Sequence, residues 1–201
     1  MEHSGKKIKM KVISFDEDLK KALNVLINGG IILYPTDTIW GLGCDATSAD
    51  AVGKIFRIKK RSDSKSLIIL VNGFPMLERY VGNIPEVAAS ILDVSDKPIT
   101  IIYPGGRNLA PGVFSEDGSL AVRICNDDFC NELITKFRKP VVSTSANFSE
   151  LPSPAVFNEI DEKIILSADY VVKHRQTDIH KKTPSSIIKV DNNGVIKIIR
   201  Q

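Results

Sequence analysis

The feature that most constrains the fold is an apolar run that ends abruptly in small polar residues and glycines. The run Ile31–Tyr34 is long enough for a buried strand, and Pro35 ends it. It is followed by Thr36-Asp37-Thr38 and then by Gly41-Leu42-Gly43. Hydroxyl groups and glycines after a strand let a ligand approach the backbone closely, although a simple turn capped by threonine is an equally good interpretation.

Helices and strands alternate in the first half of the chain, and strands dominate towards its end. Helical spacing of apolar residues predicts helices over 16–28, 49–58, 76–81, 86–92 and 127–137. Apolar runs predict strands over 31–34, 66–71, 99–103, 121–124, 141–142, 170–172, 186–190 and 195–199, the last two forming a hairpin. We expect an α+β (mixed α/β) fold with one mixed sheet, a single domain over 11–201 and a flexible tail over 1–10. The polar segment 173–184 is expected to be mobile.

Composition excludes several classes of protein. The net charge of +3, from 27 basic and 24 acidic residues, is too small for a general nucleic-acid binder, so any basic patch must be local. The N-terminus does not resemble a signal peptide, and no apolar run approaches the ~20 residues that cross a bilayer. Cys44, Cys125 and Cys130 form no C-x-x-C pair and are expected to be buried reduced thiols. We therefore expect a cytoplasmic protein with no membrane contact and no bound metal site.

A cluster of basic residues follows the second predicted helix. Between positions 54 and 65 the only acidic residue is Asp63, and the basic residues are Lys54, Arg57, Lys59, Lys60, Arg61 and Lys65. Such a cluster suits a nucleoside triphosphate or an RNA backbone, and it works without a glycine-rich P-loop, which this sequence lacks. A solvated charged face is the more common fate of such a run, so the cluster alone does not decide between these interpretations.

Arg123 is unusual because it lies inside the apolar run Leu120–Ile124. A guanidinium in a buried strand needs an anionic partner, since an unpaired buried charge costs several kcal/mol. That partner is either a carboxylate of the protein or the carboxylate of a ligand, and the sequence leaves both open.

A run of hydroxyl and amide side chains, Ser143 to Asn147, follows the predicted strand 141–142. It offers donors and acceptors to a phosphate or an amino acid, although a polar turn is the simpler interpretation. The histidines lie in the tail (His3) and in the polar segment (His174, His180), so no Ser-His-Asp or metal constellation is predicted. Aromatic residues are scarce at 6%, and none interleaves with the basic cluster to stack on bases.

Several blocks of this chain occur in a fixed order: Gly29-Gly30, Tyr34-Pro35-Thr36-Asp37-Thr38, Gly41-Leu42-Gly43-Cys44-Asp45-Ala46, Ile58-Lys59-x-Arg61 and Ser143 to Asn147. Together they resemble the YrdC (TsaC) family of L-threonylcarbamoyladenylate synthases. The resemblance covers about residues 16–201 and corresponds to the catalytic domain alone, without the extra C-terminal domain of longer relatives.

The resemblance implies a twisted mixed sheet with packed helices and an open, basic, concave groove. It implies that L-threonine, bicarbonate or CO₂, and ATP are joined into threonylcarbamoyl-AMP with release of pyrophosphate, and that Mg²⁺ assists. Partner proteins would move the threonylcarbamoyl group to the adenosine beside the anticodon of tRNA. The carbamate oxygen itself attacks the α-phosphorus, so no dedicated acid or base is implied, and catalysis would rest on positioning and charge neutralisation.

Matching motifs carries the family's site residues onto this chain. Threonine would be bound by Thr36, Arg123, Ser143 and Ser185. ATP would be bound by Lys59, Arg61, Lys65, Ser119, Ser145, Asn147, Ser153 and Arg200. Lys59 and Arg61 would also stabilise the charge that develops during the reaction.

The chain departs from the family pattern at several positions. Ser95-Asp96-Lys97-Pro98-Ile99-Thr100 stands where Trp-Pro-Gly-Pro-Leu-Thr is usual. Ser62 and Ser66 replace prolines, Glu150 replaces a glycine, and Asp37 replaces the more common glutamate. These departures affect the groove wall and the loops more than the residues that would contact substrates.

Two other functions remain open at this point. The basic groove would also suit a non-enzymatic protein that binds double-stranded or ribosomal RNA, or tRNA, by shape and phosphate contacts. RNA binding needs only the basic residues, whereas the enzyme also needs Thr36, Ser143, Ser145 and Arg123, and all four are present. The third function is that of a related enzyme with another carbamoyl or amino-acid substrate, which the departure at Ser95–Thr100 keeps open.

Overall fold

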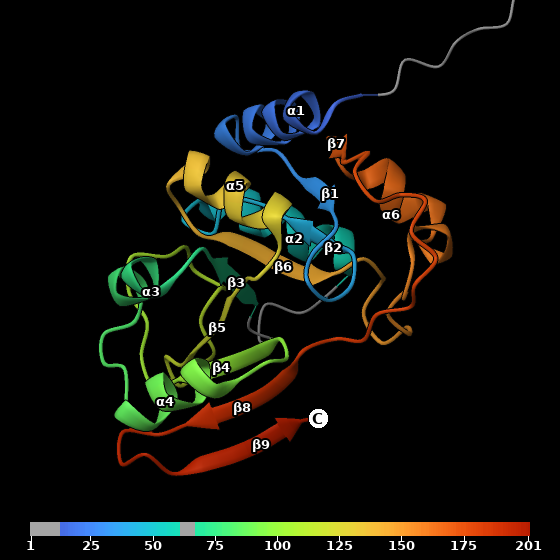
Figure 1. The fold of residues 1–201 in the computed structure, drawn as a ribbon. Coiled ribbons are helices and arrows are strands. Elements are labelled where there is room, and N and C mark those ends of the chain that lie inside the picture. Colours follow the sequence, from blue (N-terminus) through green and yellow to red (C-terminus); the bar gives the residue numbers. More distant parts are fainter. Residues whose placement is uncertain (1–12, 61–66) are drawn as a thin grey trace, which may run out of the picture.

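The computed structural model describes residues 13–60 and 67–201 (Figure 1). The helices are α1 (Phe15–Ile27), α2 (Ala49–Lys59), α3 (Phe74–Tyr80), α4 (Glu86–Val94), α5 (Asp128–Phe137) and α6 (Glu162–Ser167), with a 3₁₀ turn η1 (Phe157–Glu159). The strands are β1 (Ile32–Tyr34), β2 (Gly41–Gly43), β3 (Ile68–Val71), β4 (Ile99–Tyr103), β5 (Leu120–Ile124), β6 (Val141–Ser145), β7 (Tyr170–Val171), β8 (Ser186–Val190) and β9 (Ile196–Arg200). Every predicted helix and strand is present within a few residues of its expected bounds. Three short elements are not predicted from the sequence: β2, η1 and α6.

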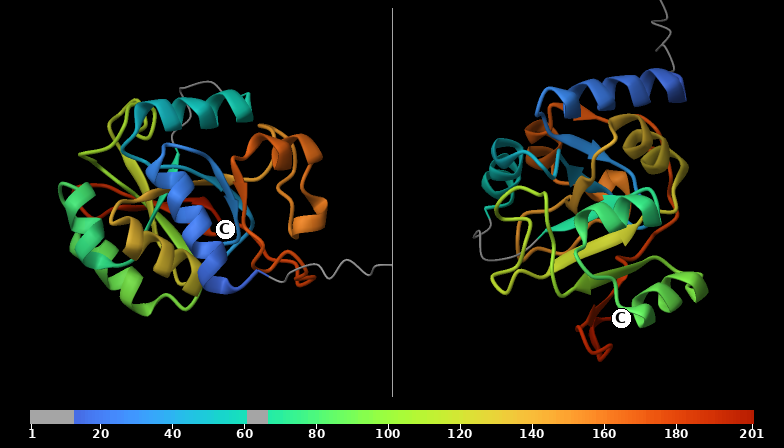
Figure 2. Two further views of the ribbon diagram at one scale, coloured as in Figure 1. Left: turned by 90° about the horizontal axis from the view of Figure 1, so that it is seen from above. Right: turned by 90° about the vertical axis from the view of Figure 1, so that its left-hand side faces the viewer.

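The strands form one mixed sheet, as predicted, in the order β7-β1-β2-β6-β3-β5-β4-β8-β9. The pairs β1–β7, β3–β5 and β4–β8 are parallel, and the remaining neighbours are antiparallel. Figure 2 shows α2 on one face of this sheet and α1, α5, α3 and α4 on the other. The C-terminal hairpin β8–β9 lies at one edge, where β8 pairs with β4 and β9 is the outermost strand.

Helices α1 and α2 begin where a serine side chain caps the first backbone N–H groups. Ser14 accepts a hydrogen bond from the Glu17 N–H at 3.2 Å, and Ser48 accepts one from the Ala51 N–H at 3.3 Å. Helix α2 ends at Lys59 and is followed by the C-cap residue Lys60, which has left-handed backbone angles with a φ of 49°. This turn sets the direction in which the chain leaves the helix directly after Lys59.

The glycines at 41–43 form strand β2 rather than the turn that the sequence predicts. Strand β2 lies between β1 and β6, and a Cβ atom on Gly43 would come within 2.5 Å of the Tyr34 ring and 2.9 Å of the Val142 carbonyl oxygen. Glycine is needed here because neighbouring strands pack too closely for any side chain. The chain after β1 therefore reverses direction through residues 35–40 and re-enters the sheet as β2, antiparallel to β1.

The polar segment after β7 is anchored at its start, contrary to the mobility expected from its composition. Buried Asp18 on α1 accepts hydrogen bonds from the backbone N–H groups of Lys173 at 2.8 Å and His174 at 2.6 Å. The His174 ring also contacts the rings of Phe15 and Phe129, at centroid distances of 5.2 and 5.8 Å. These contacts fix the path of the chain as it returns towards β8.

Two further expectations concern the ends of the chain and membranes. The predicted tail over 1–10 lies outside the described residues and stays a prediction. Across residues 13–60 and 67–201, no helix combines the length and the apolar character that crossing a bilayer requires.

Candidate functional site

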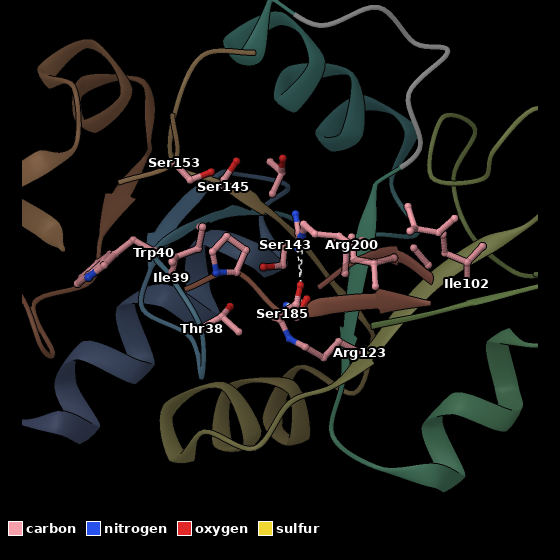
Figure 3. A pocket seen from close by; sticks show the side chains of 17 residues that line it. Thr38, Ile39, Trp40, Ile102, Arg123, Ser143, Ser145, Ser153, Ser185 and Arg200 are labelled. Atoms are coloured by element: carbon pink, nitrogen blue, oxygen red, sulfur yellow. Dashed lines mark hydrogen bonds between the residues drawn. The ribbon is translucent and has the colours of Figure 1, made fainter. Parts of the chain in front are cut away.

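A cavity of about 300 Å³ lies over the sheet between β2 and β9 (Figure 3). Its apolar lining comes from Ile39 and Trp40 in the turn after β1 and from isoleucines of β3, β4, β8 and β9. The polar side chains that line it are Thr38, Arg123, Ser143, Thr144, Ser145, Ser153, Ser185 and Arg200. A concave, partly apolar site with a few convergent polar groups is typical of small-molecule binding.

This cavity brings together half of the residues that the family resemblance selects. Those that line it are Arg123, Ser143, Ser145, Ser153, Ser185 and Arg200. Those described residues that do not line it are Thr36, Lys59, Ser119 and Asn147. Arg61 and Lys65 lie outside the described residues.

Arg123 has a partner within the protein. Its side chain and that of Asp37 are each only 5% exposed, and Arg123 Nη2 lies 3.1 Å from Asp37 Oδ1. The strand positions Arg123 next to the turn after β1, where Asp37 follows Thr36. Of the two alternatives that the sequence leaves open, the internal carboxylate is therefore the partner that the structure shows.

Ser185 connects the two arginines of the cavity. Its hydroxyl lies 2.8 Å from Thr100 Oγ1 and 3.4 Å from Arg123 Nη1. Its carbonyl oxygen accepts hydrogen bonds from Arg200 Nε at 3.0 Å and Nη2 at 2.8 Å (Figure 3). Partial burial and the nearby charge of Arg123 lower the pKa of Arg200, which is consistent with two cations facing one cavity.

Lys59 points inward from the end of α2 and is almost completely buried. Its ammonium donates to the Ser145 carbonyl oxygen at 2.6 Å and to Asn147 Oδ1 at 3.0 Å, with Ser145 Oγ at 3.4 Å. Since Ser145 lines the cavity, Lys59 and Asn147 lie directly behind its wall. At least one member of the basic cluster, Lys59, is therefore buried at the site and is not part of a solvated charged face.

Thr36 uses its hydroxyl within the turn after β1. The hydroxyl accepts from the Thr38 N–H at 3.1 Å and donates to the Ile39 carbonyl oxygen at 2.8 Å. Its side of the turn faces a smaller cavity of about 180 Å³, which shares Thr38, Ile39 and Trp40 with the main cavity. Thr38, rather than Thr36, presents its side chain to the main cavity.

The same turn is held from outside by the polar segment 173–184. Arg175 Nη1 donates to the Thr36 carbonyl oxygen at 3.2 Å, and Arg175 also pairs with Asp127 and Asp178. Lys182 Nζ lies 3.5 Å from the same oxygen. Sequence reasoning missed these contacts, and the only signal was a set of basic residues in a segment without a predicted element.

Ser119 lies just before β5, and its hydroxyl is hydrogen-bonded to a side chain of the same loop. Ser119 Oγ donates to Asp117 Oδ1 at 2.6 Å, and Lys189 Nζ lies 2.6 Å from Asp117 Oδ2. The Lys189 ammonium, with further help from Ser119, lowers the pKa of Asp117 below its usual range. The Asp117–Lys189 pair therefore connects the loop before β5 to β8.

The cysteines are free and buried, as predicted. Burial raises the pKa values of the Cys44 and Cys130 thiols well above the ordinary value, so these two stay protonated near neutral pH. Within the described residues, no group of three or more histidine, cysteine or acidic side chains could hold a metal ion.

Solved structures share this fold. The crystal structure of P. abyssi Sua5 complexed with L-threonine superimposes with a TM-score of 0.76 at 25% identity, covering 90% of this chain and 52% of Sua5. A variant of P. abyssi Sua5 gives a TM-score of 0.83, covering 94% of this chain and 57% of Sua5. E. coli YciO shares the fold with a TM-score of 0.78 at 19% identity. The chain spans just over half the length of Sua5.

Sequence comparison leads to the same group of proteins. A Methanocaldococcus jannaschii protein named putative threonylcarbamoyl-AMP synthase is 32% identical over 200 residues, covering 95% of this chain and 93% of the relative. The threonylcarbamoyl-AMP synthase of Vibrio parahaemolyticus is 28% identical over 182 residues, covering 86% of this chain and 98% of the relative. The sequence model of the Sua5/YciO/YrdC family, described as "Telomere recombination", matches residues 24–201. This chain therefore belongs to the Sua5/YciO/YrdC family.

Proposed function

We propose that this protein is a threonylcarbamoyl-AMP synthase. It would transfer the adenylyl group of ATP to a carbamate made from L-threonine and bicarbonate or CO₂, which makes it a nucleotidyltransferase. Full-length relatives that carry the name of this enzyme support the proposal, because they match the chain over most of both sequences. A Sua5 structure complexed with L-threonine supports an amino acid as one substrate.

The observation that carries the proposal is the convergence of two guanidinium groups on Ser185 within one cavity. Arg123 approaches the Ser185 hydroxyl, and Arg200 donates twice to its carbonyl oxygen. Planar forks of this kind suit the carboxylate of an amino acid and the oxygens of an adenylate. A volume of about 300 Å³ accommodates an amino acid, with the nucleotide extending beyond it.

Threonine would lie with its carboxylate at Arg123 and Ser185. The hydroxyl of Ser143 on β6 would then face its amine or hydroxyl group across the cavity. Thr36 would contribute to threonine binding indirectly, because its hydroxyl stabilises the turn that presents Thr38 to the cavity.

The nucleotide would lie towards the end of α2. Lys59 is placed behind Ser145 and Asn147, where a small displacement of its ammonium reaches a phosphate oxygen entering from the cavity. Ser153 and Arg200 line the cavity and would contact the nucleotide directly. By family resemblance we assign Arg61 and Lys65 to the phosphates and Ser119 to the nucleotide.

The proposed reaction has two bond-forming steps. The threonine amine forms a C–N bond with CO₂ and loses a proton to solvent, which gives a carbamate; from bicarbonate, that proton and the displaced hydroxide leave together as one water. A carbamate oxygen then attacks the α-phosphorus of ATP, and the bond to the leaving pyrophosphate breaks. The site would contribute positioning and charge neutralisation by Lys59 and Arg61 rather than a dedicated acid or base.

Mg²⁺ would enter as part of the ATP substrate. When bound, it neutralises phosphate charge, and it usually keeps several waters while binding substrate phosphates and few protein carboxylates. This mode fits the described residues, because they contain no cluster of acids that could serve as a separate metal site.

The enzymatic function is favoured over RNA binding alone because the similar proteins carry the name of an enzyme. We further propose that the product passes to proteins that modify tRNA beside the anticodon. A cytoplasmic location fits the three free, buried thiols, which are typical of a reducing compartment.

The direct test is to incubate the purified protein with ATP, L-threonine and bicarbonate in the presence of Mg²⁺. We expect pyrophosphate release that depends on threonine, and an adenylate product with the mass of threonylcarbamoyl-AMP. Matched reactions without threonine, without bicarbonate or with L-serine set the background and the substrate preference. Pyrophosphate release that is the same with and without threonine would contradict the proposal.

A further inference from the structure

The arginine that faces the cavity from β5 is held by an acid from a distant segment. Asp37 follows the strand β1, whereas Arg123 lies within β5, and both side chains are only 5% exposed. Arg123 Nη2 lies 3.1 Å from Asp37 Oδ1, and Asp37 Oδ2 also accepts a long hydrogen bond from the Asn126 N–H at 3.4 Å. The ion pair therefore joins the turn after β1 to the strand that carries Arg123.

The pair leaves the other end of the guanidinium available. Arg123 Nη1 lies 3.4 Å from Ser185 Oγ, which is at the long limit for a hydrogen bond. A guanidinium is planar, so a carboxylate fixed at Nη2 also fixes the direction of the N–H groups on Nη1. Those groups lie on the side of Ser185 and the cavity.

We infer that Asp37 is a positioning residue for the amino-acid substrate, which it affects by orienting Arg123; this inference rests on the proposed function. In this arrangement Asp37 does not contact the substrate, and the substrate carboxylate does not displace Asp37 from Arg123. Displacement of Asp37 by the ligand carboxylate would leave a buried aspartate without its cation, which is strongly unfavourable. The ligand carboxylate instead shares Arg123 with Asp37 and accepts from Nη1.

The charges of the cavity fit this shared arrangement. Asp37 and Arg123 together carry no net charge, whereas Arg200 forms no ion pair with any acid of the described residues. Arg200 lies close enough to Arg123 for the two charges to interact. It supplies the net positive charge for an incoming anion, while Asp37 and Arg123 supply the direction of the hydrogen bond.

The other side of Asp37 has room for a longer side chain. Asp37 also lines a second cavity of about 420 Å³, bounded by residues 95–99 and by Lys182. This is the region where the chain has Ser95-Asp96-Lys97 instead of the family's Trp-Pro-Gly. The extra methylene of a glutamate can therefore be accommodated at position 37, which makes Asp37→Glu a conservative comparison for Asp37→Asn.

The test compares wild type, Asp37→Asn and Asp37→Glu with two ligands. L-threonine carries the carboxylate, and L-threoninol has a hydroxymethyl group in its place. We expect Asp37→Asn to raise the KM and the Kd for threonine by about 10- to 100-fold, as for the loss of a charged hydrogen bond, with little change in kcat. Threoninol binding should stay almost the same, and Asp37→Glu should restore most of the threonine affinity.

Several results would overturn the inference. Equal losses for threonine and threoninol would show that Asp37 only supports the fold. Tighter threonine binding by Asp37→Asn would show that Asp37 competes with the substrate carboxylate. If Asp37→Asn does not fold, Arg123→Lys keeps the charge but removes the planar fork, and threonine affinity equal to that of wild type would refute the argument. If wild type neither binds nor uses threonine, the proposed function fails as well; if wild type uses threonine and Asp37→Asn does so equally, only this inference fails.

Discussion

The cavity wall that carries Arg123 and Arg200 holds its cations differently from the wall beside Lys59. We call the first, with Ser185 between its arginines, the arginine wall, and the second, with Ser145 and Asn147, the lysine wall. In the arginine wall, a buried carboxylate and a serine fix the two planar groups in place. In the lysine wall, hydroxyl, amide and carbonyl oxygens are among the partners of a single ammonium.

The difference matches the shapes of the two proposed substrates. An amino-acid carboxylate is small and planar, so a fork held at the correct angle binds it with little loss of entropy. A triphosphate is long and carries charge on many oxygens. A compact ammonium has no planar fork to align, so it can bind any one of these oxygens. The arginine wall is therefore expected to set selectivity for the amino acid, and the lysine wall the affinity for ATP.

Arg123→Ala should have the largest effect, because it removes the centre of the arginine wall. It leaves Asp37 buried without a cation, which is expected to cost about 3–5 kcal/mol of folding stability. Threonine-dependent pyrophosphate release should fall to background at the same time. Denaturant unfolding and the pyrophosphate assay measure the two effects.

A double variant separates stability from binding. Asp37→Leu combined with Arg123→Met replaces the buried pair by apolar groups of similar size, and such replacements are often neutral or stabilising. It should regain stability without regaining use of threonine. If the double variant uses threonine as wild type does, the arginine wall does not bind the amino acid.

Lys59→Ala should have an intermediate effect that is confined to ATP. Loss of one charged hydrogen bond to a phosphate is expected to raise the KM for ATP about 10- to 100-fold. The Kd for threonine, measured without nucleotide, should stay within about threefold of wild type, since the arginine wall is intact. Lys60→Ala is the matched control, because exposed Lys60 lies over the Phe148 ring at 5.3 Å and does not line the cavity. Equal losses of threonine and ATP affinity in Lys59→Ala would contradict the division between the walls.

The sequence predicts most of the fold because its elements have strong local signals. Buried residues at helical spacing in α1 (Leu19, Ala22, Leu26) and the turn signal of the β8–β9 hairpin both correspond to observed elements. Strand β2 could not be predicted locally, since glycine has low strand propensity and is needed only because of the Tyr34 ring and β6. Tertiary packing, not local preference, makes these residues a strand.

The site was predictable in its residue types but not in its pairings. Arg123 inside an apolar run predicts a buried anionic partner, yet only the structure identifies Asp37, which lies 86 positions earlier. The side of the turn that faces the cavity also depends on hydrogen bonds of the Thr36 hydroxyl within the turn. Contacts between segments far apart in the chain leave no mark in a single sequence.

The smallest expected effect comes from Asp117→Asn, which provides an exposed reference for the buried pair of the arginine wall. Asp117 and Lys189 are 55% and 36% exposed, so the pair is expected to contribute no more than about 1 kcal/mol at neutral pH. Because the Lys189 ammonium lowers the pKa of Asp117 in the folded protein, the contribution is present above the ordinary pKa of about 4. It is lost as the pH falls from there through the lowered folded-state value.

Urea unfolding of wild type and Asp117→Asn at several pH values measures this difference. The gap in unfolding free energy should be largest near pH 7, shrink below about pH 4 and decrease in high salt. Asparagine can still accept from Ser119, so the change isolates the charge, and Lys189→Gln should reproduce it. A gap that stays constant from neutral to acid pH would show that the difference between aspartate and asparagine at position 117 does not come from the charge of the carboxylate. The Asp117–Lys189 pair could then not be used as an exposed reference for the stability contributed by the buried Asp37–Arg123 pair.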